Sequence, residues 1–239
     1  MSRNRYLSVL ALAALTAATS ALCLEGPDPR TPAGQLAACG GAQNWRGVGY
    51  LEFEVTVTTQ GRVPESYSYR WDRTHGYLRA AIPSATGTKL DAAIDLGSKT
   101  GGAWENGQQL SGRKLTDAVT FAIKRFSEDA LWLMFPLDWG ASGVTVKPLP
   151  DVPGEGGAMC PAVEVQSQVG SWNVKLDPTT GRVVQTVLTR KGATMTVKWE
   201  GWQAHAGVFF AHKRTIAETG ETVDIDVRQA LPQAPADAF

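Results

Sequence analysis

The chain has 239 residues, and its 23 Lys and Arg residues balance its 23 Asp and Glu residues. That length suits one large all-β domain or two small domains. No run of basic residues of the kind that tracks phosphates occurs, so the sequence argues against nucleic acid as a partner. Its 8 tryptophans suit either an ordinary core or the walls of an apolar pocket, because each combines a large ring with a single donor.

Residues 1–24 have the pattern of a secretory signal peptide, with two arginines followed by an apolar run. Cys23 stands where the acylated cysteine of a lipoprotein is expected, whereas Thr19 to Ala21 offers small residues for ordinary cleavage. The sequence leaves open whether Cys23 is acylated or removed. We expect an exported protein that is periplasmic, secreted or anchored to the membrane as a lipoprotein. Residues 25–35, with several prolines, are expected to form an extended tether.

The sequence contains 3 cysteines. In an oxidising compartment thiols rarely all stay free. If Cys23 is acylated or removed, Cys39 and Cys160 remain as candidates for a disulfide. The alternative is two buried free thiols that behave as small apolar side chains.

Most of the chain alternates apolar and polar residues with the two-residue period of β-strands. Strands are predicted near 51–57, 66–71, 76–82, 88–96, 102–104, 143–147, 162–169, 172–176, 182–190, 194–199, 208–215 and 222–228. Because no repeat or internal linker interrupts them, we predict one antiparallel domain of about eleven strands over residues 36–231. The polar tail at 232–239 is expected to be flexible.

Residues 115–136 depart from this pattern and are predicted to form a helical insertion. Their apolar side chains recur at steps of three and four, which places on one face Leu115, Ala118, Val119, Ala122, Ile123 and Phe126. Ser127 can cap a second helical turn. Pro136 ends the helix because its ring and missing donor cannot continue the hydrogen-bond ladder. A lone amphipathic helix in a β-rich chain has to lie across a sheet.

Motifs of common hydrolases and metal enzymes are absent from the sequence, since neither Gly-x-Ser-x-Gly nor His-Glu-x-x-His occurs. His205 and His212 lie near or within predicted strands, but no third ligand is nearby. We expect no metal and no cofactor. An enzyme that uses His205 and His212 is the weaker alternative.

Large apolar side chains come from the helix and from the strands that should face it: Trp104, Trp132, Leu133, Phe135, Trp172 and Trp199. They predict either a filled core between sheet and helix or the lining of a half-open pocket for an acyl chain. In such a pocket each buried methylene contributes about 0.8 kcal/mol. Empty volume between sheet and helix distinguishes the two interpretations.

Four motifs resemble the periplasmic lipoprotein-carrier superfamily, the LolA/LolB type, and more closely its uncharacterised secreted or lipid-anchored relatives. They are Gly40-Gly41-x-x-x-Trp45, Trp104-Glu-Asn-Gly107, Asp129-Ala-Leu-Trp-Leu-Met-Phe-Pro136 and Leu176-Asp-Pro-Thr-Thr-Gly181. The resemblance implies an unclosed antiparallel β-barrel wrapped over a helical lid, with an apolar cavity for acyl chains. The family's lid-contacting arginine has no recognisable counterpart in the first strands, where Arg46, Arg70 and Arg73 are candidates by position.

These observations together predict a non-enzymatic, monomeric cell-envelope protein. It would bind a lipid, or the acyl chains of a lipoprotein, in an apolar cavity between half-barrel and helical lid. The alternative from another class is a structural or protein-interaction module of the envelope with a solid core and no ligand.

Overall fold

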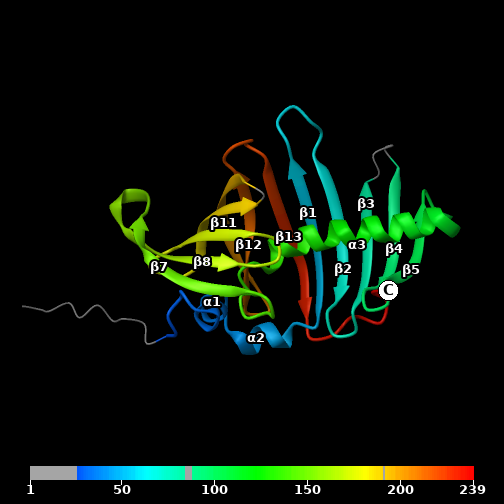
Figure 1. The fold of residues 1–239 in the computed structure, drawn as a ribbon. Coiled ribbons are helices and arrows are strands. Elements are labelled where there is room, and N and C mark those ends of the chain that lie inside the picture. The colour runs from blue at the N-terminus through cyan, green and yellow to red at the C-terminus, as the bar shows by residue number, and fades with distance from the viewer. Residues whose placement is uncertain (1–25, 84–87, 191) are drawn as a thin grey trace, which may run out of the picture.

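The computed structural model describes residues 26–239 apart from 84–87 and 191 (Figure 1). The predicted signal peptide and Cys23 lie outside the described residues.

The described chain is mainly β, with three α-helices and one short 3-10 turn. The helices are α1 (Pro32–Ala38), α2 (Ala42–Gly47) and α3 (Gly112–Met134), and the 3-10 turn is η1 (Glu155–Gly157). The strands are β1 (Tyr50–Thr58), β2 (Glu65–Asp72), β3 (Tyr77–Pro83), β4 (Lys89–Asp95), β5 (Thr100–Glu105), β6 (Gln108–Gln109), β7 (Thr145–Pro153), β8 (Met159–Gln166), β9 (Ser171–Leu176), β10 (Val183–Arg190), β11 (Ala193–His205), β12 (Val208–Ile216) and β13 (Thr222–Leu231).

All of these strands belong to one 13-stranded sheet, in the order β6-β5-β4-β3-β2-β1-β13-β12-β11-β10-β9-β8-β7. Two antiparallel meanders, β1–β6 and β7–β13, are joined where β1 pairs with β13, in a register that sets Val55 opposite Ile225. The order begins at β6 and ends at β7 without closing on itself in the described part of the chain. The predicted unclosed antiparallel fold is confirmed, with 13 strands where about eleven were expected.

Helix α3 connects the two meanders and crosses one face of β1–β5, which we call the inner face (Figure 1). It is continuous through Ser127, whose hydroxyl donates to the Ile123 carbonyl at 2.8 Å instead of capping a second helix. The helix ends at Met134, directly before Phe135 and Pro136, as the sequence predicts. Its apolar face is buried against the sheet.

Two clusters of buried side chains form the core. The first lies between α3 and the inner face of β1–β5, and it includes Phe53, Tyr69, Ala103, Val119, Phe126 and Leu133. The second lies between the chain after α3 and strands β8–β12, and it includes Phe135, Trp139, Trp172, Trp199 and Ile216. Trp132 packs against both clusters. The alternating apolar residues of β9, β11 and β13, which the sequence predicted to face inward, belong to these two clusters.

The N-terminal segment packs against the sheet. The part of the predicted tether from Pro32 onward is helical, because it belongs to α1. The Gln35 side chain donates to the Gly181 carbonyl at 2.8 Å, and the Cys39 carbonyl accepts from the Phe209 amide at 2.9 Å. The candidate disulfide is not formed, because both thiols are free and buried. Cys39 belongs to the first core cluster, whereas Cys160 on β8 packs against the β7–β8 turn.

The C-terminal tail, expected to be flexible, contacts the sheet in the structure. Ala238 is buried, and its carbonyl accepts from Arg70 at 3.5 Å. The Phe239 ring lies 6.3 Å from Tyr50 and 6.2 Å from Tyr77, centroid to centroid. These contacts attach the tail to the ends of β1 and β3.

Candidate functional site

A cavity of about 870 Å³ lies between α3 and the inner face of the sheet. Its mouth is formed by the ends of neighbouring hairpins, where Arg62 lies between β1 and β2, Val169 between β8 and β9, and Arg190 at the end of β10. Glu221, just before β13, completes this edge. The cavity therefore opens where the hairpin turns of the two meanders meet.

One wall of the cavity is apolar. Helix α3 contributes Leu131 and Trp132, and the facing strands contribute Trp172, Leu188, Met195 and Ile216. Each strand residue occupies an inward position of the alternating pattern, so the sequence of every strand supplies one row of this wall.

An aromatic cluster, defined as Trp132, Phe135, Trp139, Trp172 and Trp199, fills the space beside this wall. The Trp132 ring centroid lies 6.0 Å from those of Trp172 and Trp199. Phe135 lies 5.0 Å from Trp172 and 5.5 Å from Trp199. Such spacings are those of packed aromatic pairs. The open volume lies next to the cluster, and two of its rings form part of the cavity wall.

The residues expected to line a ligand site are thus distributed over four environments. Trp132 and Trp172 line the cavity. Phe135 and Trp199 pack behind them in the aromatic cluster, and Leu133 is buried in the first core cluster. Trp104 lies on the outer face of β5, because its neighbour Ala103 is buried against α3 and successive strand residues point to opposite faces.

The opposite wall of the cavity is polar and connects α3 to β2. The Tyr69 hydroxyl donates to Asp129 Oδ2 at 2.6 Å, and Arg125 binds both carboxylate oxygens of Asp129, at 3.0 and 2.7 Å. The Arg125 guanidinium also lies 4.0 Å from the Tyr67 ring centroid. Burial, and a hydrogen bond to Glu65, raise the pKa of Tyr67 to about 12, so its hydroxyl stays protonated at neutral pH.

Arg214 makes the second connection between α3 and the sheet, and sequence reasoning missed it. Its side chain is 0% exposed and donates to the Trp132 carbonyl at 2.7 Å and to the Ala211 carbonyl at 2.6 Å. Its guanidinium lies 4.8 Å from the Trp199 ring centroid. Burial lowers the pKa of Arg214 to about 9, which still leaves it protonated at neutral pH. The sequence could have indicated its position, because Arg214 lies two residues before the inward-facing Ile216 on the same strand and therefore shares its face.

The three arginines expected by position lie elsewhere. Arg70 forms an ion pair with Glu52 at 3.6 Å. Arg73 stacks on Trp45 at 3.5 Å and donates to the Trp45 carbonyl at 3.3 Å, which holds α2 against the sheet. Arg46 is exposed in the last turn of α2.

The two histidines of the enzyme alternative have ordinary surroundings. His212 Nδ1 donates to the Ile225 carbonyl at 2.9 Å, and the His205 ring lies 6.3 Å from the Phe210 ring. Over the described ranges, no group of three or more His, Cys, Asp or Glu side chains is arranged to hold a metal ion. Neither histidine is among the residues that line the inner cavity.

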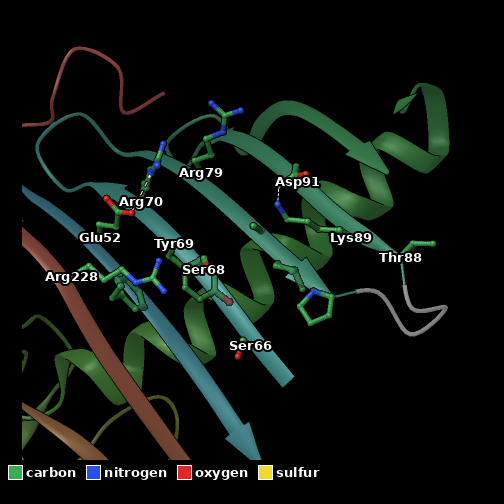
Figure 2. Close-up of a pocket in the computed structure, with 14 residues that line it drawn as sticks. Glu52, Ser66, Ser68, Tyr69, Arg70, Arg79, Thr88, Lys89, Asp91 and Arg228 are labelled. Carbon is green, nitrogen blue, oxygen red and sulfur yellow. Dashed lines mark ion pairs between the residues drawn. The ribbon is translucent and has the colours of Figure 1, made fainter. Parts of the chain in front are cut away.

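A second hollow, of about 720 Å³, lies on the outer face of β1–β4 (Figure 2). Figure 2 shows charged side chains on the strand face turned away from α3, with ion pairs between Arg70 and Glu52 and between Lys89 and Asp91. A third hollow, of about 470 Å³, lies beside Cys160 and the β7–β8 turn. Neither has the large aromatic wall on one side and the polar wall on the other that distinguish the inner cavity, so the inner cavity is the stronger candidate site.

None of the helices in residues 26–239, excluding 84–87 and 191, combines the length and apolarity needed to cross a membrane.

No protein-family model matches the chain, and no curated protein sequence matches it. Similar solved structures include a LolA superfamily protein, NE2245 from Nitrosomonas europaea, with a TM-score of 0.48 and 9% identity over 85% of this chain and 96% of that chain. The MucA/MucB complex of Pseudomonas aeruginosa has a TM-score of 0.24 and 11% identity over 86% of this chain and 61% of that chain. A conserved protein from Thermus thermophilus has a TM-score of 0.26 and 9% identity over 85% of this chain and 93% of that chain.

Proposed function

We propose that this protein is a cell-envelope protein that binds a lipid, or the acyl chains of a lipoprotein, in the cavity between α3 and the sheet. The observation that carries the proposal is the open volume of about 870 Å³ against the rings of Trp132 and Trp172. Sites for small ligands commonly enclose about 300–1,000 Å³ and are lined mainly by apolar and aromatic side chains with a few polar groups. The cavity has both the size and the lining of such a site.

The apolar wall supplies the driving force for an acyl chain. Each methylene moved from water into apolar surroundings contributes about 0.8 kcal/mol, so about ten methylenes contribute roughly 8 kcal/mol before the entropic cost of binding. No chemical step is required of the protein. Arg125 and Asp129 of the polar wall bind each other, so the acyl chain would lie against the apolar wall opposite them.

A second candidate function is a structural or protein-interaction module without a ligand. The close packing within the aromatic cluster favours it, because those rings fill part of the space between helix and sheet. In this case the cavity would hold only water, and its walls would matter for stability alone.

Quenching of tryptophan fluorescence by a fatty acid that carries bromine in mid-chain distinguishes the two functions. A chain in the cavity places bromine beside Trp132 and Trp172, so we expect saturable quenching below the concentration at which the fatty acid forms micelles. The variant with Trp132→Phe and Trp172→Phe should lose most of the quenchable signal, whereas Trp104→Phe on the outer face should retain it. Absence of saturable quenching in the wild-type protein would favour the module without a ligand.

Export and anchoring are part of the proposal and are tested separately. The signal peptide should be cleaved on export. Removal of residues 1–24 takes Cys23 away, whereas cleavage directly before Cys23 would let it be acylated and would add the mass of its lipid chains. The intact mass of the protein purified from an expressing bacterium reports both. A chain that retains its first residues would refute cleavage, and a mass equal to the cleaved polypeptide would refute acylation.

A further inference from the structure

The lining of the inner cavity carries three cations without partners in the described chain. Arg62 in the β1–β2 turn, Lys124 on α3 and Arg190 at the end of β10 all line the cavity. All three side chains are exposed, and none makes an ion pair or side-chain hydrogen bond with another described residue. Their donors are directed to solvent or to whatever enters the cavity.

The acidic side chains of the same lining are mostly engaged with protein donors. Asp129 is bound by Arg125 and Tyr69, which leaves it little capacity to attract a ligand cation. Glu221 accepts from the Thr59 hydroxyl at 2.8 Å, and the Glu65 carboxylate accepts from Tyr67.

Glu128 is the one lining carboxylate that has no hydrogen bond within the described residues. The formal charges of the lining balance, with four cations and four carboxylates. Among these charged side chains, three cations and one carboxylate have no hydrogen-bond or ion-pair partner within the described residues.

The free cations and the apolar wall occupy different parts of the cavity. Arg62 and Arg190 belong to hairpin ends at the mouth, whereas Trp132 and Trp172 pack into the aromatic cluster further inside. A guanidinium binds carboxylate or phosphate oxygens through paired hydrogen bonds, which a neutral headgroup cannot match. We propose that the ligand is an amphiphile with an anionic headgroup, carboxylate or phosphate, held by Arg62 and Arg190 at the mouth and by Lys124 on α3, while its tail lies against Trp132 and Trp172. This inference rests on the proposed function and narrows its ligand class.

Probes with one tail and different headgroups test the inference on the full exported protein. Dodecanoate, dodecyl phosphate and the uncharged methyl ester of dodecanoic acid are compared by displacement of an apolar fluorescent probe. We expect both anions to bind at least about ten-fold more tightly than the ester, and the preference to shrink as salt is added because exposed charges are screened. The tighter of the two anions identifies the carboxylate or the phosphate as the headgroup.

Variants assign that preference to the mouth. The double variant with Arg62→Gln and Arg190→Gln should bind the anions about ten-fold more weakly and the ester unchanged. The matched control is Arg79→Gln, because Arg79 is exposed and lines the outer hollow. Equal affinity of the wild type for all three probes would overturn the anionic headgroup while leaving the proposed function intact. Failure of every probe to bind would overturn both.

Discussion

The buried contact between Tyr69 and Asp129 offers a direct test of what holds α3 against the sheet. Tyr69 is 1% exposed, and its hydroxyl donates to Asp129 Oδ2 at 2.6 Å. Its ring packs 5.1 Å from Phe53 and 5.5 Å from Phe126. Tyr69→Phe removes one oxygen and leaves these ring contacts in place, so the substitution isolates the hydrogen bond.

The expected cost follows from the charge of the acceptor. Hydrogen bonds to charged groups contribute about 1.5–3 kcal/mol, roughly twice the value for neutral pairs. In the variant Arg125 still binds both oxygens of Asp129, so the buried carboxylate keeps hydrogen-bond donors. We therefore expect the free energy of unfolding to fall by about 2 kcal/mol. In urea unfolding followed by tryptophan fluorescence, this loss should lower the midpoint by about 1 M at an unchanged slope.

Tyr77→Phe is the matched control, because Tyr77 is 47% exposed and packs against Phe239. It should change the free energy of unfolding by less than about 0.5 kcal/mol. A double-mutant cycle of Tyr69→Phe with Asp129→Asn should show coupling of at least about 1 kcal/mol. If Tyr69→Phe costs no more than Tyr77→Phe, the hydrogen bond between Tyr69 and Asp129 does not hold the helix against the sheet.

Gly40→Ala should lower the free energy of unfolding by at least about 2 kcal/mol, because φ is 103° and the added Cβ would lie 1.9 Å from the Gly207 carbonyl oxygen. Gly47→Ala, with nothing within 4 Å of its Cβ, should change stability by less than about 1 kcal/mol, and similar melting temperatures for the two variants would contradict the geometry. Burial raises the pKa of the Cys39 thiol to about 12, so iodoacetamide at pH 8 should leave Cys39 unmodified in the folded protein and alkylate it in urea, as read by peptide mass spectrometry. Since the folded-state pKa exceeds that of the unfolded chain, this thiol's contribution to stability should be complete at neutral pH and fall as the pH rises toward about 12.

The alternation of apolar residues was sufficient to predict the strands and their inward faces. On β13, Val223, Ile225 and Val227 are 4%, 1% and 4% exposed, as their two-residue spacing predicts. The prediction succeeds because the side-chain period of a strand is a local property that does not depend on which strand lies beside it. The start of α3, in contrast, was placed three residues late, because its first residue Gly112 has a φ of 56° that no sequence pattern indicates.

Contacts between distant parts of the chain could not be predicted in the same way. The hydrogen bond from Arg214 to Trp132 joins residues 82 positions apart, and no local pattern selects that carbonyl among many. On β5 the alternation is weak, because two glycines precede Ala103, and Trp104 was therefore assigned to the inner face. The packing of Trp199 behind Trp132 was equally inaccessible, since it depends on how far the sheet curves.

The position of the cavity follows from the unequal extents of the helix and the sheet. A helix rises about 1.5 Å per residue, so the 23 residues of α3 extend about 35 Å. Strands lie about 4.8 Å apart, so 13 of them extend about 58 Å along the curve of the sheet. One helix cannot cover that width.

Helix α3 therefore packs closely on β3–β5, and large rings at its C-terminal end, beginning with Trp132, cover the inner face of β9–β11. Between these two covered regions the hairpin ends project past the helix, and no further element lies above them in the described part of the chain. The cavity occupies this gap. Its apolar wall includes the rings that cover the sheet where the helix does not reach. Its polar wall consists of the residues that hold the helix against the sheet.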